Sequence, residues 1–472
     1  MGALNFNIFR GYDIRGIVPT ELNEDTVRLI IRAFATLLYE RQITQTVLMR
    51  DNRLTGKDFA RYTTEELLKA GIDVIDNGLG LSPLMYFSQY HYLAKAGIML
   101  TASHNPAEYN GFKLATGFSD TLVTEEIEDM VKIIKSKRFL KCKRRAELKQ
   151  DSPFPAYVKD MKKRITLKKK FKVVIDACNG PVGKFTPKLF SEFGIQVIKQ
   201  NCRLDGTFPS GTADPTEARV MERLAKRVLI EKADLGFAYD TDGDRIGIVD
   251  ENGRITWNDV LVALFAKDIL SYMKGAKIIF NTLCSKATSD TIEQAGGIPV
   301  IWLTGHSFIK AKLKEERAPF GGELSGHFFF MDNFYGHDDG AYTSLRLLQF
   351  LDRKGFTLGQ AIDELPKYCS SPEIKLGLDD EIKFNFINSK IKKDLKKLFG
   401  KTAKYLDIDG IRADTKNEMA IVRASQNGPY ITIKFEAKTK AKYKLLRREI
   451  AKILHSHKEI DFSYGVNTKE IK

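Results

Sequence analysis

The first three quarters of the sequence alternate short apolar segments with amphipathic helical patterns, and this alternation limits the folds open to the chain. The apolar segments predict strands at Thr46–Met49, Ile72–Ile75, Gly97–Leu100, Lys172–Asp176, Gln196–Ile198, Leu235–Tyr239, Ile246–Val249, Lys277–Phe280 and Pro299–Leu303. Helical patterns lie between several of them, for example at Asp25–Tyr39 and Lys184–Phe193. Strands that alternate with helices form layered α/β domains, so we expect an α/β fold.

The chain of 472 residues is too long for one hydrophobic core. We expect α/β domains at 1–150, 151–251 and 252–369, and a different, smaller domain at 370–472. In this last part, Met419–Ala424 and Tyr430–Glu436 alternate apolar and polar residues and precede a helical pattern at Ala441–His455. That pattern predicts an α+β domain.

Composition excludes several classes of protein. The sequence has no run of about 20 apolar residues and no secretory signal at its start, so we expect a cytoplasmic protein with no membrane partner. Its five cysteines form no CxxC pair, which argues against a disulfide framework and against a zinc site.

The net charge of +15 raises the possibility of a nucleic-acid partner. Between Lys132 and Lys172, however, 17 basic residues face three acidic ones, so this segment carries nearly all of the excess. Its aromatic residues are too sparse for a base-stacking surface. We favour a solvated connector between domains and keep a nucleic-acid-binding protein that uses 132–172 as the non-enzymatic alternative.

Three carboxylates alternate along the acidic loop Asp240–Arg245 (DTDGDR), directly after a predicted strand. Carboxylates this close raise one another's pKa unless a cation compensates them, and Mg²⁺ prefers such oxygen ligands. An EF-hand calcium loop has similar spacing, but Arg245 stands where that loop needs glycine. A solvated acidic turn without a metal is the other interpretation.

Three further loops carry polar groups suited to chemistry. The serine loop Thr101–Pro106 (TASHNP) follows a predicted strand and offers Ser103 as a nucleophile, although an ordinary turn has the same composition. The loop Gly321–His327 (GGELSGH) offers a carboxylate, a hydroxyl and an imidazole. Such a set could bind sugar hydroxyls, and we call this segment the sugar-recognition loop. The phosphate loop Arg423–Pro429 (RASQNGP) offers an arginine, a hydroxyl and amides, which suit a phosphate group.

In this order, the four loops resemble those of the α-D-phosphohexomutases, and among them the bacterial-type phosphomannomutase/phosphoglucomutase group. The resemblance spans essentially the whole chain. Five further motifs contribute to it: Phe9–Gly16 (FRGYDIRG), Asn110–Lys113 (NGFK), Val174–Gly180 (VIDACNG), Thr304–Ser307 (TGHS) and Asp409–Arg412 (DGIR).

The resemblance implies four domains around a central cleft, and an intramolecular transfer between hexose 1-phosphate and hexose 6-phosphate. The transfer would pass through a phosphate on Ser103 and a hexose 1,6-bisphosphate, which serves as intermediate and activator. Mg²⁺ would bind Asp240, Asp242 and Asp244, with the Ser103 phosphate completing its site.

The resemblance also assigns roles to other residues. Arg245 would lie near the reacting phosphoryl group, and Lys113 and His327 would transfer protons or stabilise charge. Contacts to the sugar phosphate would come from Tyr12, Arg15, His306, Glu323, Ser325, Arg423, Ser425, Gln426 and Asn427. A monomer or a homodimer is expected, with a small sugar phosphate as the partner.

The sequence departs from the family pattern in three places. Gln426 and Asn427 stand where many relatives have Asn-Thr, Leu283 stands where some have a substrate-binding lysine, and Pro209–Pro215 lacks the usual histidine. Lys286, one helical turn after Leu283, is not expected to compensate. Ser325 followed by Gly-His favours mannose and glucose substrates, with phosphoglucosamine mutase as the enzymatic alternative.

Overall fold

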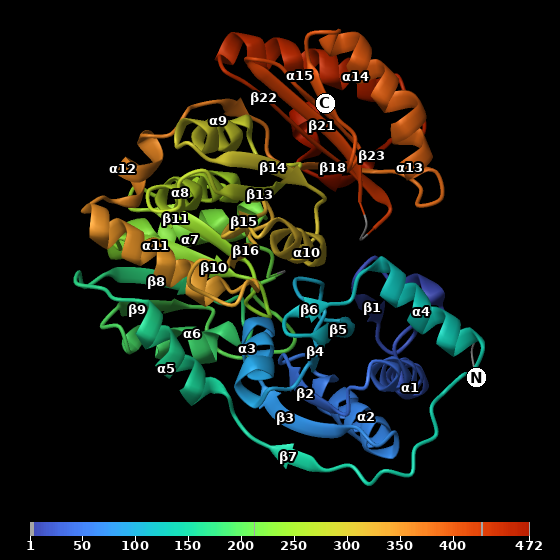
Figure 1. The fold of residues 1–472 in the computed structure, drawn as a ribbon. Helices are drawn as coiled ribbons and strands as arrows, with labels where there is room; N and C mark the ends of the chain where they lie inside the picture. The colour runs from blue at the N-terminus through green and yellow to red at the C-terminus, as the bar shows by residue number, and fades with distance from the viewer. Residues whose placement is uncertain (1–3, 212, 426–427, 472) are drawn as a thin grey trace. The chain divides into compact units, whose positions relative to one another are not determined.

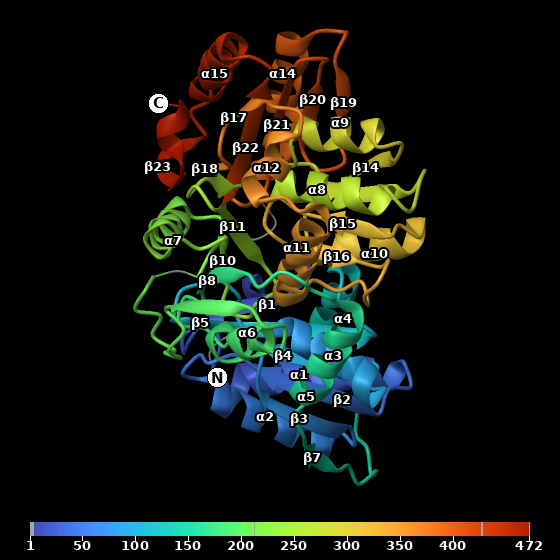
Figure 2. The same cartoon turned by 90° about the vertical axis from the view of Figure 1, so that its left-hand side faces the viewer.

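The computed structural model describes residues 4–211, 213–425 and 428–471 and is drawn in Figures 1 and 2. The chain forms two compact units. Unit 1 contains Met1–Asn258 and Ser325–Asp363, and unit 2 contains Asp259–Leu324 and Glu364–Lys472. Three sheets that alternate with helices, followed by a fourth sheet whose strand pairs are antiparallel, confirm the expected architecture of three α/β domains and an α+β domain.

The first sheet, in unit 1, has the strand order β1-β5-β4-β2-β3-β7, with β6 beside β5. Its strands are β1 (Ile14–Ile17), β2 (Gln45–Arg50), β3 (Asp73–Leu79), β4 (Ala96–Leu100), β5 (Tyr109–Gly117), β6 (Asp120–Thr121) and β7 (Leu148–Gln150). The helices of this part are α1 (Glu24–Glu40), α2 (Gly56–Lys69), α3 (Ser82–Tyr92) and α4 (Thr124–Lys135), after the short 3₁₀ turn η1 (Phe6–Ile8). Strands β2, β3 and β4 are parallel, whereas β5 runs antiparallel to β4.

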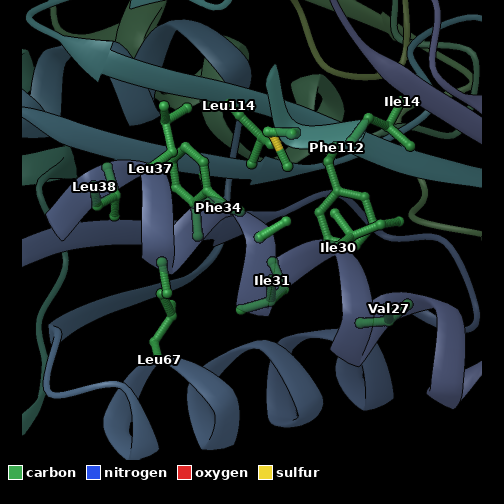
Figure 3. Close-up of a cluster of buried hydrophobic side chains, with 14 of the residues drawn as sticks. Ile14, Val27, Ile30, Ile31, Phe34, Leu37, Leu38, Leu67, Phe112 and Leu114 are labelled. Carbon is green, nitrogen blue, oxygen red and sulfur yellow. The ribbon is translucent and has the colours of Figure 1, made fainter. Parts of the chain in front are cut away.

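Helix α1 shows why this sequence folds as it does. The Asn23 side chain caps its first turn by accepting a hydrogen bond from the Thr26 amide at 3.1 Å. Its apolar residues recur at helical spacing and are buried against β5, as Phe34 and Phe112 illustrate in Figure 3. The sheet's core on this side therefore follows from the 3.6-residue period of α1 and the two-residue period of the strands.

The second sheet, also in unit 1, has the order β12-β11-β10-β8-β9. Its strands are β8 (Lys172–Asp176), β9 (Gln196–Gln200), β10 (Leu235–Tyr239), β11 (Ile246–Asp250) and β12 (Ile255–Thr256). The helices are α5 (Phe154–Arg164), α6 (Val182–Ser191) and α7 (Ala218–Glu231), and unit 1 also holds β16 (Phe328–Phe330), α11 (Gly340–Lys354) and α12 (Leu358–Asp363). Strand β10 is parallel to β8 and antiparallel to β11, so the acidic loop joins two neighbouring strands.

Unit 2 begins with a parallel set in which β13 lies between β14 and β15. These strands are β13 (Lys277–Asn281), β14 (Ile298–Trp302) and β15 (Phe320–Gly322), and their helices are α8 (Asn258–Leu270), α9 (Lys286–Gln294) and α10 (His306–Glu316). The fourth sheet has the order β19-β20-β21-β22-β18-β23, with β17 beside β22.

The strands of the fourth sheet are β17 (Cys369–Ser370), β18 (Ile374–Gly377), β19 (Lys404–Leu406), β20 (Ile411–Asp414), β21 (Glu418–Ala424), β22 (Tyr430–Ala437) and β23 (Asp461–Val466). Its helical elements are α13 (Lys383–Phe386), the π-helical turn η2 (Ile387–Ile391), α14 (Lys392–Phe399), α15 (Lys440–His455) and the 3₁₀ turn η3 (Thr468–Ile471). The antiparallel β21–β22 pair and α15 confirm the α+β character expected of this part.

The polar residues of β22 do not face water, although their alternation with apolar residues is typical of a half-exposed strand. Lys434 and Glu436 are both buried. The Lys434 ammonium donates to Asp259, and a Glu436 carboxylate oxygen accepts from the Ser285 hydroxyl at 3.0 Å. Both faces of β22 are therefore covered, one by apolar residues and one by a polar network with the preceding part of unit 2.

The helices and the cysteines were also compared with what the sequence predicted. Across the helices within the described ranges, none is both long and apolar enough to cross a membrane. All five cysteines are free thiols, as their irregular spacing predicted.

Candidate active site

The serine loop follows the buried strand β4 and holds Ser103 in the left-handed region at φ 49°. The Ser103 amide donates to Thr101 Oγ1 at 2.9 Å, and that hydroxyl donates to Asp51 Oδ2 at 2.7 Å. Ser103 is fully buried, and its Oγ donates to Asp240 Oδ2 at 2.8 Å. The folded chain thus brings the predicted nucleophile to the acidic loop, which lies 137 residues further on.

Arg53 holds the serine loop by its backbone. Its two terminal nitrogens donate to the carbonyl oxygens of Ser103, Asn105, Pro106 and Tyr109 at 2.6 to 2.8 Å, an arrangement that we call the Arg53 clamp. The guanidinium also pairs with Asp51 at 3.2 Å. Neither residue was predicted, yet Asp51 and Arg53 both follow β2 at the same edge of the sheet. The rule that polar residues after parallel strands line sites could have indicated them.

The acidic loop connects β10 to β11, and its three carboxylates are buried. One oxygen atom from each of Asp240, Asp242 and Asp244 lies within 4.8 Å of the others. Gly243 allows the turn because it adopts φ 75°, and a Cβ there would meet Val182 at 2.9 Å. This burial excludes the solvated acidic turn that the sequence had left open.

Lys113 lies on β5 and places its ammonium between two of these carboxylates. It donates to Asp242 Oδ2 at 2.6 Å and also to Asp244 Oδ2. Burial alone would lower the pKa of Lys113, but the neighbouring carboxylates outweigh it and raise that pKa. Burial and then the repulsion from Asp244 and Asp242 raise the pKa of Asp240 well above its ordinary value. The loop therefore holds more negative charge than its neighbours fully compensate.

Arg245 and His327 form a second part of this cluster. Arg245 Nε donates to His327 Nε2 at 2.9 Å and lies 3.8 Å from Asp240 Oδ2. Since Nε2 accepts this bond, the proton of a neutral His327 ring is on Nδ1, which lies 2.8 Å from Asp338 Oδ2. Asp338 was not predicted, although the segment 337–340 (HDDG) places two carboxylates before a glycine, as the acidic loop does.

Arg15 and Tyr12 also belong to unit 1. The Arg15 guanidinium pairs with Asp13 at 2.6 Å and donates to Asn105 Oδ1 of the serine loop at 2.7 Å. Tyr12 is buried, and its charge interactions include both Arg15 and Arg245. Residues from five separate sequence motifs thus gather around Ser103 in this unit.

The other predicted contact residues divide between the units. Ser325 is half-buried in unit 1, although Glu323 of the same sugar-recognition loop belongs to unit 2. In unit 2, Glu323 Oε1 accepts from the Gly305 amide at 2.7 Å, and the buried His306 begins α10.

The phosphate loop begins at the end of β21, also in unit 2. Arg423 Nε donates to Asp409 Oδ2 at 2.8 Å, and the Ser425 amide donates to the Tyr430 carbonyl at 3.0 Å. Gln426 and Asn427 lie outside the described residues. Lys286 pairs with Asp290 on its own helix at 3.0 Å, and Leu283 is buried. That Lys286 does not replace the missing lysine stays a prediction.

Comparisons with known proteins define the class to which this fold and site belong. Family models described as phosphoglucomutase/phosphomannomutase, alpha/beta/alpha domains I, II and III, match residues 7–141, 155–253 and 257–368 in that order. The chain belongs to the phosphoglucomutase/phosphomannomutase family, as the sequence motifs indicated.

Individual relatives agree along the full length. The chain is 38% identical to the phosphomannomutase/phosphoglucomutase of Pseudomonas putida, covering 94% of this chain and 95% of that one. It is 33% identical to a phosphoglucomutase of Neisseria meningitidis, covering 97% and 98%. The crystal structure of a phosphoglucomutase/phosphomannomutase family protein from Burkholderia thailandensis superposes with a TM-score of 0.88 at 32% identity, covering 96% and 98%. These similarities support an isomerase that interconverts hexose phosphates.

Proposed function

We propose that this enzyme interconverts the 1-phosphates and 6-phosphates of mannose, of glucose or of both, through a phosphate carried on Ser103. The observation that supports this most is the 2.8 Å hydrogen bond from Ser103 Oγ to Asp240 Oδ2. A phosphate on that oxygen would lie against the acidic loop, where its charge requires a compensating cation. The nucleophile and the loop that suits a cation therefore belong to one site.

The donor set of the acidic loop fits Mg²⁺. Asp242 Oδ1 and Asp244 Oδ1 are buried and have no hydrogen-bond partner among the described residues, and Mg²⁺ takes carboxylate oxygens and commonly leaves positions for phosphate. We infer that Asp240, Asp242, Asp244 and a Ser103 phosphate oxygen would hold the ion. When bound, it would supply positive charge to the phosphoryl group in transit.

In the proposed first half-reaction, a hexose hydroxyl oxygen bonds to phosphorus while the bond from phosphorus to Ser103 Oγ breaks. The hydroxyl proton passes to a nearby base and a proton returns to Ser103 Oγ, which leaves hexose 1,6-bisphosphate. Arg245 and Lys113 are close enough to the acidic loop to offset the charge spread over the transferring group. The Nδ1 tautomer of His327 accepts the bond from Arg245 Nε with its Nε2 lone pair, so His327 is proposed to hold this arginine where it can stabilise the charge of the transferring group.

The second half-reaction returns the other phosphate of the bisphosphate to Ser103, after the sugar has turned around. The same contacts must then accept both orientations. We assign the grip on the non-transferring phosphate to Arg423 and Ser425, with Gln426 and Asn427, and the sugar contacts to Glu323, Ser325 and His306. Tyr12 and Arg15 are proposed to complete the binding site. Hexose 1,6-bisphosphate is the proposed activator because it can restore a lost Ser103 phosphate.

Substrate choice decides between the enzymatic alternatives. The test is turnover of mannose, glucose, glucosamine and N-acetylglucosamine 1-phosphates side by side, with Mg²⁺ and a trace of the matching bisphosphate. The proposal expects mannose or glucose 1-phosphate to have the highest kcat/KM. A higher value for glucosamine 1-phosphate would make the protein a phosphoglucosamine mutase instead, and no turnover with intact phosphate on Ser103 would overturn the mechanism.

Several cations of the basic segment already have carboxylate partners, which supports the connector. Arg144 pairs with Asp73 at 3.0 Å, Lys149 with Asp151 at 3.0 Å and Arg164 with Asp160 at 2.7 Å. We therefore propose no nucleic-acid partner, and expect no shift of a labelled RNA or DNA at 150 mM salt. We also propose that the protein is a monomer or a homodimer and that it is cytoplasmic. The free thiols support the cytoplasmic location.

A further inference from the structure

Asp409 lies in the DGIR motif, to which the proposed reaction gives no role. The residue is 9% exposed, and a single oxygen of its carboxylate, Oδ2, accepts three hydrogen bonds. Arg423 Nε donates at 2.8 Å, Thr282 Oγ1 at 3.0 Å and the Thr304 amide at 3.1 Å. All four residues belong to unit 2, and the donors come from the ends of three different strands, β21, β13 and β14.

The bond to Asp409 fixes the guanidinium of Arg423 along one edge. A bidentate contact to phosphate through the two terminal nitrogens leaves this Nε bond intact, so aiming the side chain and binding phosphate are compatible. Burial acts to lower the pKa of Arg423, but the Asp409 carboxylate outweighs burial and raises that pKa. Arg423 is 5% exposed, so the orientation of its side chain depends on the hydrogen bond to Asp409 more than on solvent.

The hydrogen bond between Asp409 and the Thr304 amide connects Arg423 to residues that are assigned to sugar binding. The next amide along the chain, that of Gly305, donates to Glu323 Oε1 at 2.7 Å. Gly305 adopts φ 140°, which favours glycine, and His306 then begins α10. Two successive amides of one loop are thus held by two carboxylates, one bonded to the candidate phosphate arginine and one assigned to the sugar.

We propose that Asp409 is a positioning residue that holds Arg423 and the loop Thr304–His306 in one arrangement, so that the phosphate and sugar contacts act as one binding surface. This rests on the proposed role of Arg423 as the grip on the non-transferring phosphate. That phosphate is bound in the ground state and in the transition state alike, so loss of aim raises KM and leaves kcat nearly unchanged.

Asp409→Asn is the direct test, because asparagine keeps the shape and removes the charge. Its amide oxygen can take the place of Oδ2 and accept the same three bonds, but without the negative charge the bond from the Arg423 guanidinium is weaker and no longer fixes that side chain as firmly. The matched control is Asp414→Asn. Asp414 pairs with Arg412 at 2.7 Å, and Arg412 donates to the carbonyls of Thr282 and Cys284 at 2.7 Å, so the control loosens the same loop without touching Arg423.

We expect Asp409→Asn to raise KM for the preferred hexose 1-phosphate at least tenfold, with kcat within threefold of the wild type, and Asp414→Asn to change KM less than twofold. Melting temperatures of both variants report any loss of folding, which lowers the active fraction and hence kcat without raising KM. Equal KM effects in the two variants, or a KM for Asp409→Asn within twofold of the wild type, would overturn the positioning role.

A binding measurement separates this inference from the proposed reaction. In the Ser103→Ala background, where no transfer occurs, calorimetric titration with glucose 6-phosphate should give a Kd at least tenfold weaker when Asp409→Asn is added, and an unchanged Kd with Asp414→Asn. Unequal binding of this kind sustains the inference even if wild-type turnover fails. If the wild type turns over but Ser103→Ala has the same Kd with and without Asp409→Asn, the positioning role alone is refuted. If glucose 6-phosphate does not bind the Ser103→Ala protein at all, the positioning role and the phosphate-binding role of Arg423 are both refuted.

Discussion

The carboxylates around Ser103 in unit 1 and those near Arg423 in unit 2 are all buried, but the protein compensates them differently. In unit 1, Asp240, Asp242 and Asp244 converge and share Lys113 and Arg245. In unit 2, Asp409 has its own arginine together with neutral donors, and Glu323 accepts a backbone amide. Excess negative charge is concentrated where phosphoryl transfer is proposed. In contrast, the charges of Asp409 and Glu323 are compensated by hydrogen-bond donors of the protein. The difference predicts that variants of Ser103 and of the acidic loop change kcat and metal dependence, whereas Arg423 and Asp409 variants change KM.

Removal of the nucleophile has the largest expected effect. Ser103→Ala should lower kcat by a factor of about 10⁴ or more, because the covalent relay is lost. Intact-protein mass spectrometry after incubation with glucose 1,6-bisphosphate should show no added phosphate. The control is Ser88→Ala, a buried serine whose hydroxyl donates to the Met85 carbonyl of its own helix. A kcat near the wild-type value in Ser103→Ala would remove Ser103 from the mechanism.

Asp242→Asn tests the excess charge of the acidic loop. We expect kcat to fall about 100-fold or more and the Mg²⁺ concentration for half-maximal activity to rise, since one ligand loses its charge. Chelation with EDTA should abolish wild-type activity and added Mg²⁺ should restore it. Asp234→Asn, which alters a carboxylate paired with Lys169 in the same part of unit 1, should leave the Mg²⁺ response unchanged. A chelator-resistant wild type would contradict the metal assignment.

Arg423→Ala should act mainly on KM, in contrast to the two preceding variants. Loss of a charged hydrogen-bond donor to a phosphate is expected to raise KM by about 10- to 100-fold. Initial rates over a range of hexose 1-phosphate concentrations measure the change, with Arg448→Ala on the exposed side of α15 as the control. If kcat fell while KM stayed constant, the division of tasks between the units would be wrong.

Ser325→Ala should have the smallest effect and the most selective one. A lost hydrogen bond to one sugar hydroxyl changes the ratio of kcat/KM for mannose and glucose 1-phosphates by about two- to tenfold. The two substrates are compared in one competition assay. Equal losses for every hexose would assign Ser325 to general binding instead of sugar selection.

The sequence alone predicted many of the strands, the four-part architecture and the loops that follow the strands. It did not predict short or edge strands such as β1, β7 and β16, whose apolar patterns are too brief to stand out. The contact between Ser103 and Asp240 was reached through the family resemblance, because local patterns do not report which loops meet across 137 residues. Arg53 was missed although its place directly after β2 could have indicated it. Asp338 and Asp409 were missed as site residues because local patterns do not report their contacts with His327 and Arg423. The burial of Lys434 and Glu436 on β22 was unexpected for the same reason: an alternating pattern does not distinguish water from a buried polar partner.

The Arg53 clamp affects how the enzyme regains activity after an incomplete catalytic cycle. Four carbonyl oxygens of the serine loop are held by a side chain that neither carries nor requires the phosphate. In the proposed cycle, escape of hexose 1,6-bisphosphate before it has turned around would leave Ser103 without its phosphate. We expect its backbone to stay in the same shape, so recovery demands only fresh bisphosphate and no rebuilding of the nucleophile's surroundings. We therefore expect the unphosphorylated and phosphorylated forms of the enzyme to interconvert without refolding of the serine loop.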